Sequence, residues 1–217
     1  MILYATPLSS FALRVRLVLA LKGLAAEVRP PPDGYRSAAF RAIFPTGQAP
    51  VLVDGDLTLG EADVIAQYLD ERAPDPPLMP ADPAGRARVR LLCRYHDLHL
   101  DPPLRPLFPA GAAEGDARAV LAERLAIFAG LARPGPFLHG DRPTLADLAC
   151  LGTLVLAPRL LPGLAIPPRL ADLPGRVAAR PAAGPVMAAH AAAADAWLAA
   201  RAAAHAAAQI PPARKDA

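Results

Sequence analysis

The sequence predicts an α/β fold followed by an all-α one. The first 72 residues alternate short apolar strands with amphipathic helices, and strand signals vanish beyond the stretch APDPPLMPADP, residues 73–83. Its prolines can neither continue a helix nor enter a central strand, so this stretch is a linker. We therefore expect an α/β domain over residues 1–76, a linker over 77–83 and an all-helical domain over 84–217.

The first domain is predicted to begin with a strand, a helix and a second strand. Residues 1–5 and 26–30 are short strands. Between them, residues 10–21 place leucines on one face, which is typical of an amphipathic helix. Gly23 follows as a natural helix stop.

Four further elements complete this domain. A weaker helix is predicted over residues 37–43. Residues 50–60 alternate apolar and polar side chains around Asp54-Gly55, a dipeptide that favours a hairpin. Residues 61–72 carry an apolar stripe at helical spacing. The predicted order is therefore β-α-β-α-β-β-α.

Only helices are predicted beyond the linker. Residues 84–101 and 113–132 are helical, and the stretch DPPLRPLFP, residues 101–109, breaks the first of them. Residues 185–208 are dominated by alanine and are helical on propensity alone. The tail, residues 210–217, is predicted to fray.

The helix predicted within residues 143–158 is continuously apolar for several turns. It opens with Thr144-x-x-Asp147, which resembles a capping box with Asp in place of Glu. Asp147 is therefore interpreted as a folding device and not as a catalyst. We expect this helix at the centre of its domain, buried on most sides.

Composition excludes several classes of function. The 217 residues are 53% hydrophobic and 20% charged, enough apolar material for a substantial core. A formal charge of +3, scattered arginines and 5% aromatic residues are unlike a nucleic-acid-binding surface. No run approaches the roughly 18 apolar residues of a membrane-spanning helix, and no signal peptide is evident. Cys93 and Cys150 lie far apart, as expected for buried thiols in a reducing compartment, so we expect a cytoplasmic protein with no nucleic-acid or membrane partner.

Several spaced segments together resemble the cytosolic glutathione transferase superfamily, in particular its serine-type bacterial members. They are SSFALRVRLVLALKGL, PTGQAPVLVDGD, LGEADVIAQYLDE and FLHGDRPTLADLA, with the proline-rich linker between the last two. The first is most similar to the zeta class, whose motif begins Ser-Ser-Cys and continues Trp-Arg-Val-Arg. The resemblance implies a thioredoxin-like domain plus a helical bundle, with glutathione as co-substrate.

The resemblance places the catalytic serine at Ser9, with Ser10 as its neighbour. A hydroxyl that donates a hydrogen bond to the glutathione sulfur favours the thiolate, which is the nucleophile. The start of the following helix adds partial positive charge at the same point. Serine is also a preferred helix cap. Both roles can hold if Ser10 caps the helix and Ser9 points outward.

The resemblance also places glutathione-binding groups at Gln48, Ala49, Pro50, Glu61 and Ala62. The proline of this fold follows a cis peptide, and the backbone before it pairs with the cysteinyl part of glutathione. Gln48 either reaches the glycyl end or is a solvent-facing loop residue. At Glu61-Ala62 the family usually has Glu or Gln followed by Ser, which holds the γ-glutamyl carboxylate at a helix start. Ala62 keeps the N–H and lacks the hydroxyl.

An apolar electrophile is expected in a pocket between the domains, facing Ser9. Phe11, Leu104, Leu107 and Phe108 are the candidate lining residues, with the core as the alternative place for large apolar side chains. Phe11 stands where the zeta motif has cysteine.

No metal is expected. His96 and His99 lie three residues apart on a helix without an evident third ligand.

The expected function is conjugation of glutathione to an electrophile by a homodimer. The family uses the helix that contains Asp97 and Asp101 at its dimer interface, where an acidic residue reaches the partner's glutathione. Two alternatives stay open, a zeta-type glutathione-dependent isomerase and a non-catalytic binding or interaction module of the same fold. Ala62 favours the module, whereas Ser9 and the Ala49-Pro50 pair argue against it.

Overall fold

The computed structural model describes residues 1–109, 112 and 114–208. The first part of the chain folds into seven elements in the predicted order β-α-β-α-β-β-α. They are β1 (Ile2–Tyr4), α1 (Ser10–Leu21), β2 (Glu27–Arg29), α2 (Ala38–Ile43), β3 (Val51–Asp54), β4 (Leu57–Leu59) and α3 (Ala62–Arg72).

The four strands form one mixed sheet in the order β2-β1-β3-β4. Strand β1 pairs parallel to β2, which α1 makes possible as the crossover, and antiparallel to β3. Strands β3 and β4 form the predicted hairpin, with Gly55 at a positive φ of 60° in its turn. Helices α1 and α3 pack against each other. This is the thioredoxin-like arrangement that the resemblance implies.

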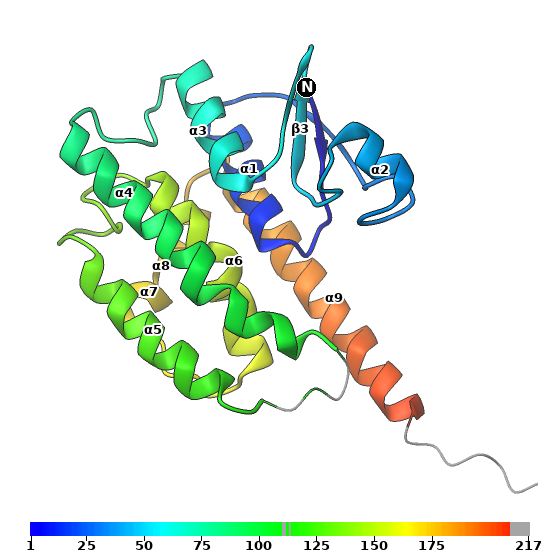
Figure 1. The fold of residues 1–217 in the computed structure, drawn as a ribbon. Helices are drawn as coiled ribbons and strands as arrows, with labels where there is room; N and C mark the ends of the chain where they lie inside the picture. Colours follow the sequence, from blue (N-terminus) through cyan, green and yellow to red (C-terminus); the bar gives the residue numbers. More distant parts are fainter. Residues whose placement is uncertain (110–111, 113, 209–217) are drawn as a thin grey trace, which may run out of the picture.

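The second part is helical. Its elements are α4 (Pro83–Tyr95), η1 (His96–Leu100), η2 (Pro102–Leu107), α5 (Ala117–Leu131), α6 (Leu145–Leu160), α7 (Pro168–Ala171), α8 (Leu173–Ala178) and α9 (Gly184–Ala208). Figure 1 shows α4 and α5 side by side and the long α9 running past α1.

Three details differ from the prediction for this part. The helix expected over residues 84–101 leaves α-geometry after Tyr95 and continues as one π-helical turn, η1. The stretch 101–109 was expected only to end the preceding helix, but it forms the 3₁₀ helix η2. Pro102 and Pro103 begin η2, because proline is tolerated in a first helical turn. Helices α7 and α8 were not predicted, because both are short, have a proline in the first turn and show no periodic pattern of apolar residues. Residue 113 and residues 210–217 lie outside the described residues.

Helix α6 is the central element of the second part, as predicted. Every residue in it except Pro158 and Arg159 is buried. At Gly152 it approaches α1 so closely that a Cβ there would lie 2.2 Å from Ser10 Cβ. The absence of a side chain at Gly152 therefore sets how deeply α1 sits against the helical part.

The connecting segment is tied to the first part by a buried ammonium. Lys22 Nζ donates to the carbonyls of Ala73 (2.7 Å) and Pro76 (2.6 Å) and lies 2.5 Å from Asp70 Oδ1. The same Asp70 oxygen accepts from Leu78 N at 2.8 Å. Residues 73–78 are thus anchored to the ends of α1 and α3.

Candidate active site

Two adjoining cavities lie along the start of α1. The larger, of about 500 Å³, is lined by Ser9, Phe11, Tyr35, Arg36, Thr46, Gln48, Ala49, Pro50, Glu61, Ala62 and Arg105. The smaller, of about 380 Å³, is lined by Thr6, Leu8, Ser9, Ser10, Phe11, Tyr35, Asp101, Arg105 and Phe108. Ser9 thus belongs to both cavities.

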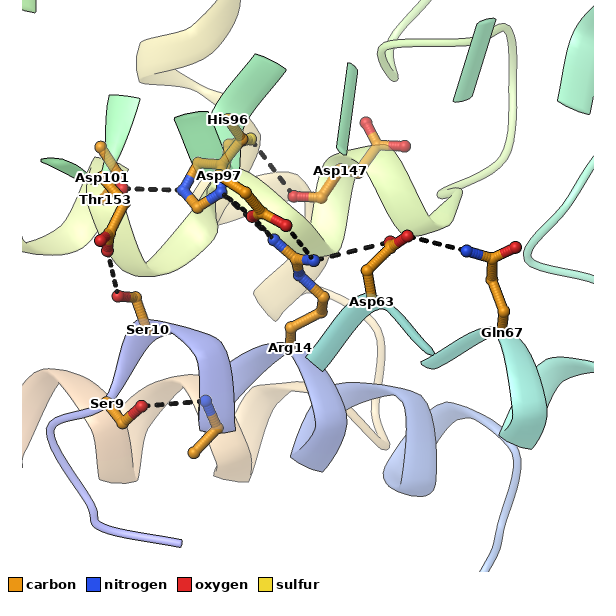
Figure 2. Close-up of polar contacts among 12 residues, drawn as sticks. Ser9, Ser10, Arg14, Asp63, Gln67, His96, Asp97, Asp101, Asp147 and Thr153 are labelled. Carbon is orange, nitrogen blue, oxygen red and sulfur yellow. Dashed lines mark hydrogen bonds and ion pairs between the residues drawn. The ribbon is translucent and has the colours of Figure 1, made fainter. Parts of the chain in front are cut away.

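Ser9 itself caps α1, which corrects the expectation that Ser10 would do so. Ser9 Oγ accepts a hydrogen bond from Ala12 N at 3.1 Å (Figure 2). A hydroxyl oxygen can accept while its proton donates elsewhere. Among the described residues, no acceptor is paired with the Ser9 proton. One hydroxyl can therefore cap the helix and donate into the cavity.

Ser10 is the first residue of α1 and points away from the larger cavity into the protein. It is buried, and its Oγ donates to Asp101 Oδ1 at 3.0 Å. Arg105 Nε donates to the other Asp101 oxygen at 2.7 Å. Ser10 therefore fixes α1 against the residue that follows the π-helical turn, and of the two cavities it borders only the smaller one.

The other residues expected to bind glutathione line the larger cavity with Ser9. The Ala49-Pro50 peptide is cis and directly precedes β3. At the start of α3, Glu61 has a positive φ of 61° and supplies no side-chain cap. The first amides of a helix have no carbonyl partner within it, so the N–H groups of Ala62, Asp63 and Val64, which precede the Ile65 N–H bonded to Glu61 O, remain available at the start of α3.

Four residues that line the larger cavity were not predicted from the sequence: Tyr35, Arg36, Thr46 and Arg105. Tyr35 and Arg36 belong to the β2–α2 loop, where Asp33, Gly34 and Arg36 all have positive φ. Tyr35 is 50% exposed, and its hydroxyl lies 2.7 Å from Thr6 Oγ1. The turn-rich run PPPDG, residues 30–34, was the available signal for a loop beside the site.

The predicted electrophile residues divide into two pairs. Phe11 borders both cavities and Phe108 borders the smaller one. Leu104 and Leu107 line neither, because they are buried in the hydrophobic core. The Arg105 guanidinium lies 5.5 Å from the Phe11 ring centroid, so a cation and an aromatic face stand together beside Ser9.

A buried charge cluster lies behind the site, as Figure 2 shows. The fully buried Arg14 forms an ion pair with Asp97 and lies 3.5 Å from Asp63 Oδ1. His96 Nδ1 lies 2.8 Å from Asp97 Oδ1, and its Nε2 lies 2.9 Å from Thr153 Oγ1. Because a carboxylate only accepts, His96 donates from Nδ1 to Asp97 and accepts at Nε2 from Thr153.

The charges of this cluster shift one another's proton affinity. Burial alone would raise the pKa of Asp97, but hydrogen bonds from His96 and Arg14 and the charge of Arg14 lower it to about 2. Burial would lower the pKa of Arg14, yet its neighbours, Asp97 first and then Cys93 and Asp63, more than offset this, and the pKa of Arg14 is raised. Burial lowers the pKa of His96. Asp97 and Asp101 are thus both engaged within their own chain.

Helix α9 positions the segment before Ser9. The buried His190 has its Nδ1 3.0 Å from the Pro7 carbonyl oxygen, which can only accept, so the ring donates there.

Cys93 and Cys150 are free and buried, as expected, and burial raises the pKa of both thiols. Asp147 has the expected folding role, since its Oδ2 accepts from Thr144 N at 2.7 Å.

In the part of the chain that the structure describes, no group of three His, Cys, Asp or Glu residues could hold a metal ion. Within the same residues, no helix is both long and apolar enough to cross a membrane.

Comparison with known proteins identifies the family. Residues 3–77 match the family model described as the glutathione S-transferase N-terminal domain. Maleylacetoacetate isomerase of Pseudomonas aeruginosa is 35% identical over 195 residues, covering 83% of this chain and 92% of that protein. A stringent starvation protein A homolog of Coxiella burnetii is 33% identical over 183 residues, covering 79% and 81% respectively.

A solved structure of a related enzyme has the same fold. It is maleyl pyruvate isomerase, described as a bacterial glutathione S-transferase in the zeta class. It superposes with a TM-score of 0.73 at 27% identity over 87% of this chain and 98% of that one.

The chain has a thioredoxin-like sheet followed by a helical bundle, with a cavity at the start of α1. It is therefore a protein with an α/β part and an all-α part. Among such proteins, the chain belongs to the glutathione transferase superfamily.

Proposed function

We propose that this protein is a glutathione-dependent enzyme in which the Ser9 hydroxyl donates a hydrogen bond to the glutathione thiolate. The observation that carries the proposal is the uncommitted Ser9 proton at a cavity whose wall also holds Ala49-Pro50 and the start of α3. A donor beside sulfur favours the anionic form, and the amino end of α1 adds partial positive charge at the same point.

The charges of the larger cavity suit the rest of the tripeptide. Glutathione carries two carboxylates and one ammonium group. The amides at Ala62 and beyond would hold the γ-glutamyl carboxylate, and Arg36 would pair with the glycyl carboxylate. Glu61 is the only carboxylate among the described residues that line this cavity, and it would face the ammonium group. The backbone of Ala49 would pair with the cysteinyl part.

Conjugation would proceed by attack of the thiolate on an electrophilic carbon in the smaller cavity. A carbon–sulfur bond forms there, and the leaving group departs with the electron pair of the bond that breaks. Phe11 and Phe108 would contact the apolar body of the electrophile.

A second candidate activity is glutathione-dependent isomerisation of an acidic substrate, for which Arg105 is the supporting observation. Its side chain is 61% exposed and borders both cavities, where its guanidinium would pair with a substrate carboxylate. Two of the relatives described above are named as isomerases of maleylacetoacetate and maleyl pyruvate. Turnover of these compounds by the wild type, abolished in Arg105→Met, would favour isomerisation over conjugation.

Calorimetry with glutathione, followed by a conjugation assay with a chromogenic aryl halide, tests the principal proposal. We expect Ser9→Ala to keep glutathione affinity within about threefold and to lower kcat by about a hundredfold, since a group aimed at the developing charge contributes on this scale. Ser9→Thr retains a hydroxyl and should keep most of the activity. Binding without turnover of any of these substrates would instead favour the non-catalytic module, and absence of binding at millimolar glutathione would refute the glutathione site.

We also propose a homodimer. Large apolar side chains are exposed on four helical elements, namely Val64 on α3, Leu91 on α4, Leu98 on η1 and Ile127 on α5. Such surface favours association between protein chains. Light scattering should give twice the chain mass for the wild type and the single-chain mass for Leu91→Glu. A wild type of single-chain mass at micromolar concentration would contradict the dimer.

A further inference from the structure

The buried guanidinium of Arg14 stands between two carboxylates from different helices. Arg14 Nη1 lies 3.2 Å from Asp97 Oδ2 and 3.5 Å from Asp63 Oδ1, and Nη2 completes the pair with Asp97 (Figure 2). Asp97 has a second donor in His96. Among the described residues, Arg14 is the only cation that forms an ion pair with Asp63.

Asp63 lies where its charge matters to a ligand. It is the second residue of α3, directly after Ala62 in the cavity wall. Its Oδ2 accepts from Gln67 Nε2 at 2.7 Å, so the carboxylate is held within the first turns of the helix. A negative charge at this place neutralises the positive end of the helix and repels an anion bound there.

The side chain of Asp63 is 29% exposed and that of Arg14 is fully buried. Water screens a charge in such a position only in part, so the neighbouring guanidinium has a large effect on the net field. When Arg14 is present, its positive charge offsets the negative charge of Asp63. The amides at Ala62 therefore keep their attraction for an anion.

We propose that Arg14 is a positioning residue for glutathione binding, which neutralises and holds Asp63 so that the start of α3 can accept the γ-glutamyl carboxylate. This inference rests on the function proposed above. Arg14 would act on glutathione binding through Asp63 and would not contact the ligand itself.

Calorimetric titration of the full-length protein with glutathione tests this role. We expect Arg14→Met to raise the Kd about tenfold and Arg14→Lys, which keeps the charge, to stay within about threefold of wild type. Adding Asp63→Asn to Arg14→Met should bring the Kd back to within about threefold of wild type, because the repelling charge is gone. A loss of packing alone would not be restored in this way.

Two further variants keep the test decisive. Arg16→Met is the matched control, since Arg16 lies on the same helix, is half-buried and has no ion pair among the described residues; its Kd should stay at the wild-type value. Asp63→Asn alone should bind glutathione at least as tightly as the wild type does. This variant keeps the buried Arg14, so it tests the charge of Asp63 by itself. Thermal unfolding checks that each variant is folded.

The outcomes separate this inference from the proposed function. If the wild type binds glutathione and Asp63→Asn weakens binding, or fails to rescue a folded Arg14→Met, Arg14 does not act by neutralising Asp63. If the wild type itself does not bind, the proposed glutathione site and this inference both fail.

Discussion

Ser9 combines two tasks that sequence reasoning assigned to two residues. Its oxygen caps α1 and its proton is free to donate, so a single substitution removes both interactions. We expect Ser9→Ala to lower the free energy of unfolding by about 1 kcal/mol, the usual contribution of a serine cap, in addition to its effect on turnover. Urea denaturation measures this. Ser9→Asp retains a capping oxygen and should keep the stability while still lacking the neutral donor. Equal stability of wild type and Ser9→Ala would contradict the capping role.

Ala62 is the residue at which the chain departs from the usual family pattern. A serine there would add a hydroxyl to the amides that face the γ-glutamyl carboxylate. Hydrogen bonds to charged groups contribute about 1.5–3 kcal/mol, so we expect Ala62→Ser to lower the Kd for glutathione by about tenfold or more. Calorimetry measures the change. An unchanged Kd would mean that the carboxylate does not lie at the start of α3.

Asp97 makes stability depend on acid. Its pKa is about 2 in the folded chain and 3.8 without the fold, so its contribution is present above pH 4 and is lost as the pH falls toward 2. The difference corresponds to about 2 kcal/mol. Urea unfolding of wild type and Asp97→Asn should therefore show a stability gap that narrows by this amount between pH 5 and pH 2. A constant gap would contradict the shifted pKa.

At the scale of elements, the contact between α1 and α6 sets the position of Ser9. A Cβ at Gly152 would lie 2.2 Å from Ser10 Cβ and 2.5 Å from Ser10 Cα, so Gly152→Ala forces the two helices apart. We expect a loss of about 1–3 kcal/mol in the free energy of unfolding, as is usual for overpacking, together with lower activity. Gly130→Ala is the matched control, because a Cβ there meets nothing within 4 Å. Equal effects of the two substitutions would show that the close approach carries no cost.

Elements with strong local signals were predictable from sequence. Helix α1 begins at Ser10 and ends at Leu21 as expected, because its leucine spacing and Gly23 mark it locally. The α3 start and the Ala49-Pro50 pair were found through the family motifs. Tyr35 and Arg105 were missed because folding alone brings them to Ser9, through a loop with left-handed residues and a 3₁₀ turn that local patterns do not specify. Leu104 and Leu107 show the converse, since burial and not residue type decides whether a leucine lines a cavity.

At the scale of the whole molecule, the two parts meet through α1. Its contacts with α3, α6 and α9 place the cavity at the seam between the sheet and the helices. The walls of the larger cavity come from the β1–α1, β2–α2 and α2–β3 loops and the starts of α1 and α3, and Arg105 is the contribution of the helical part. The shape of this cavity therefore depends on how η2 sits against the first part, which no single segment of the sequence reveals.

The Lys22 ammonium has a practical consequence for dissecting this molecule. A fragment that stopped at residue 72 would remove both carbonyls on which that cation depends, and one that stopped at residue 76 would still leave Asp70 without the Leu78 amide. A fragment of the thioredoxin-like half that keeps all of these interactions must therefore extend at least to Leu78, which lies within the predicted linker.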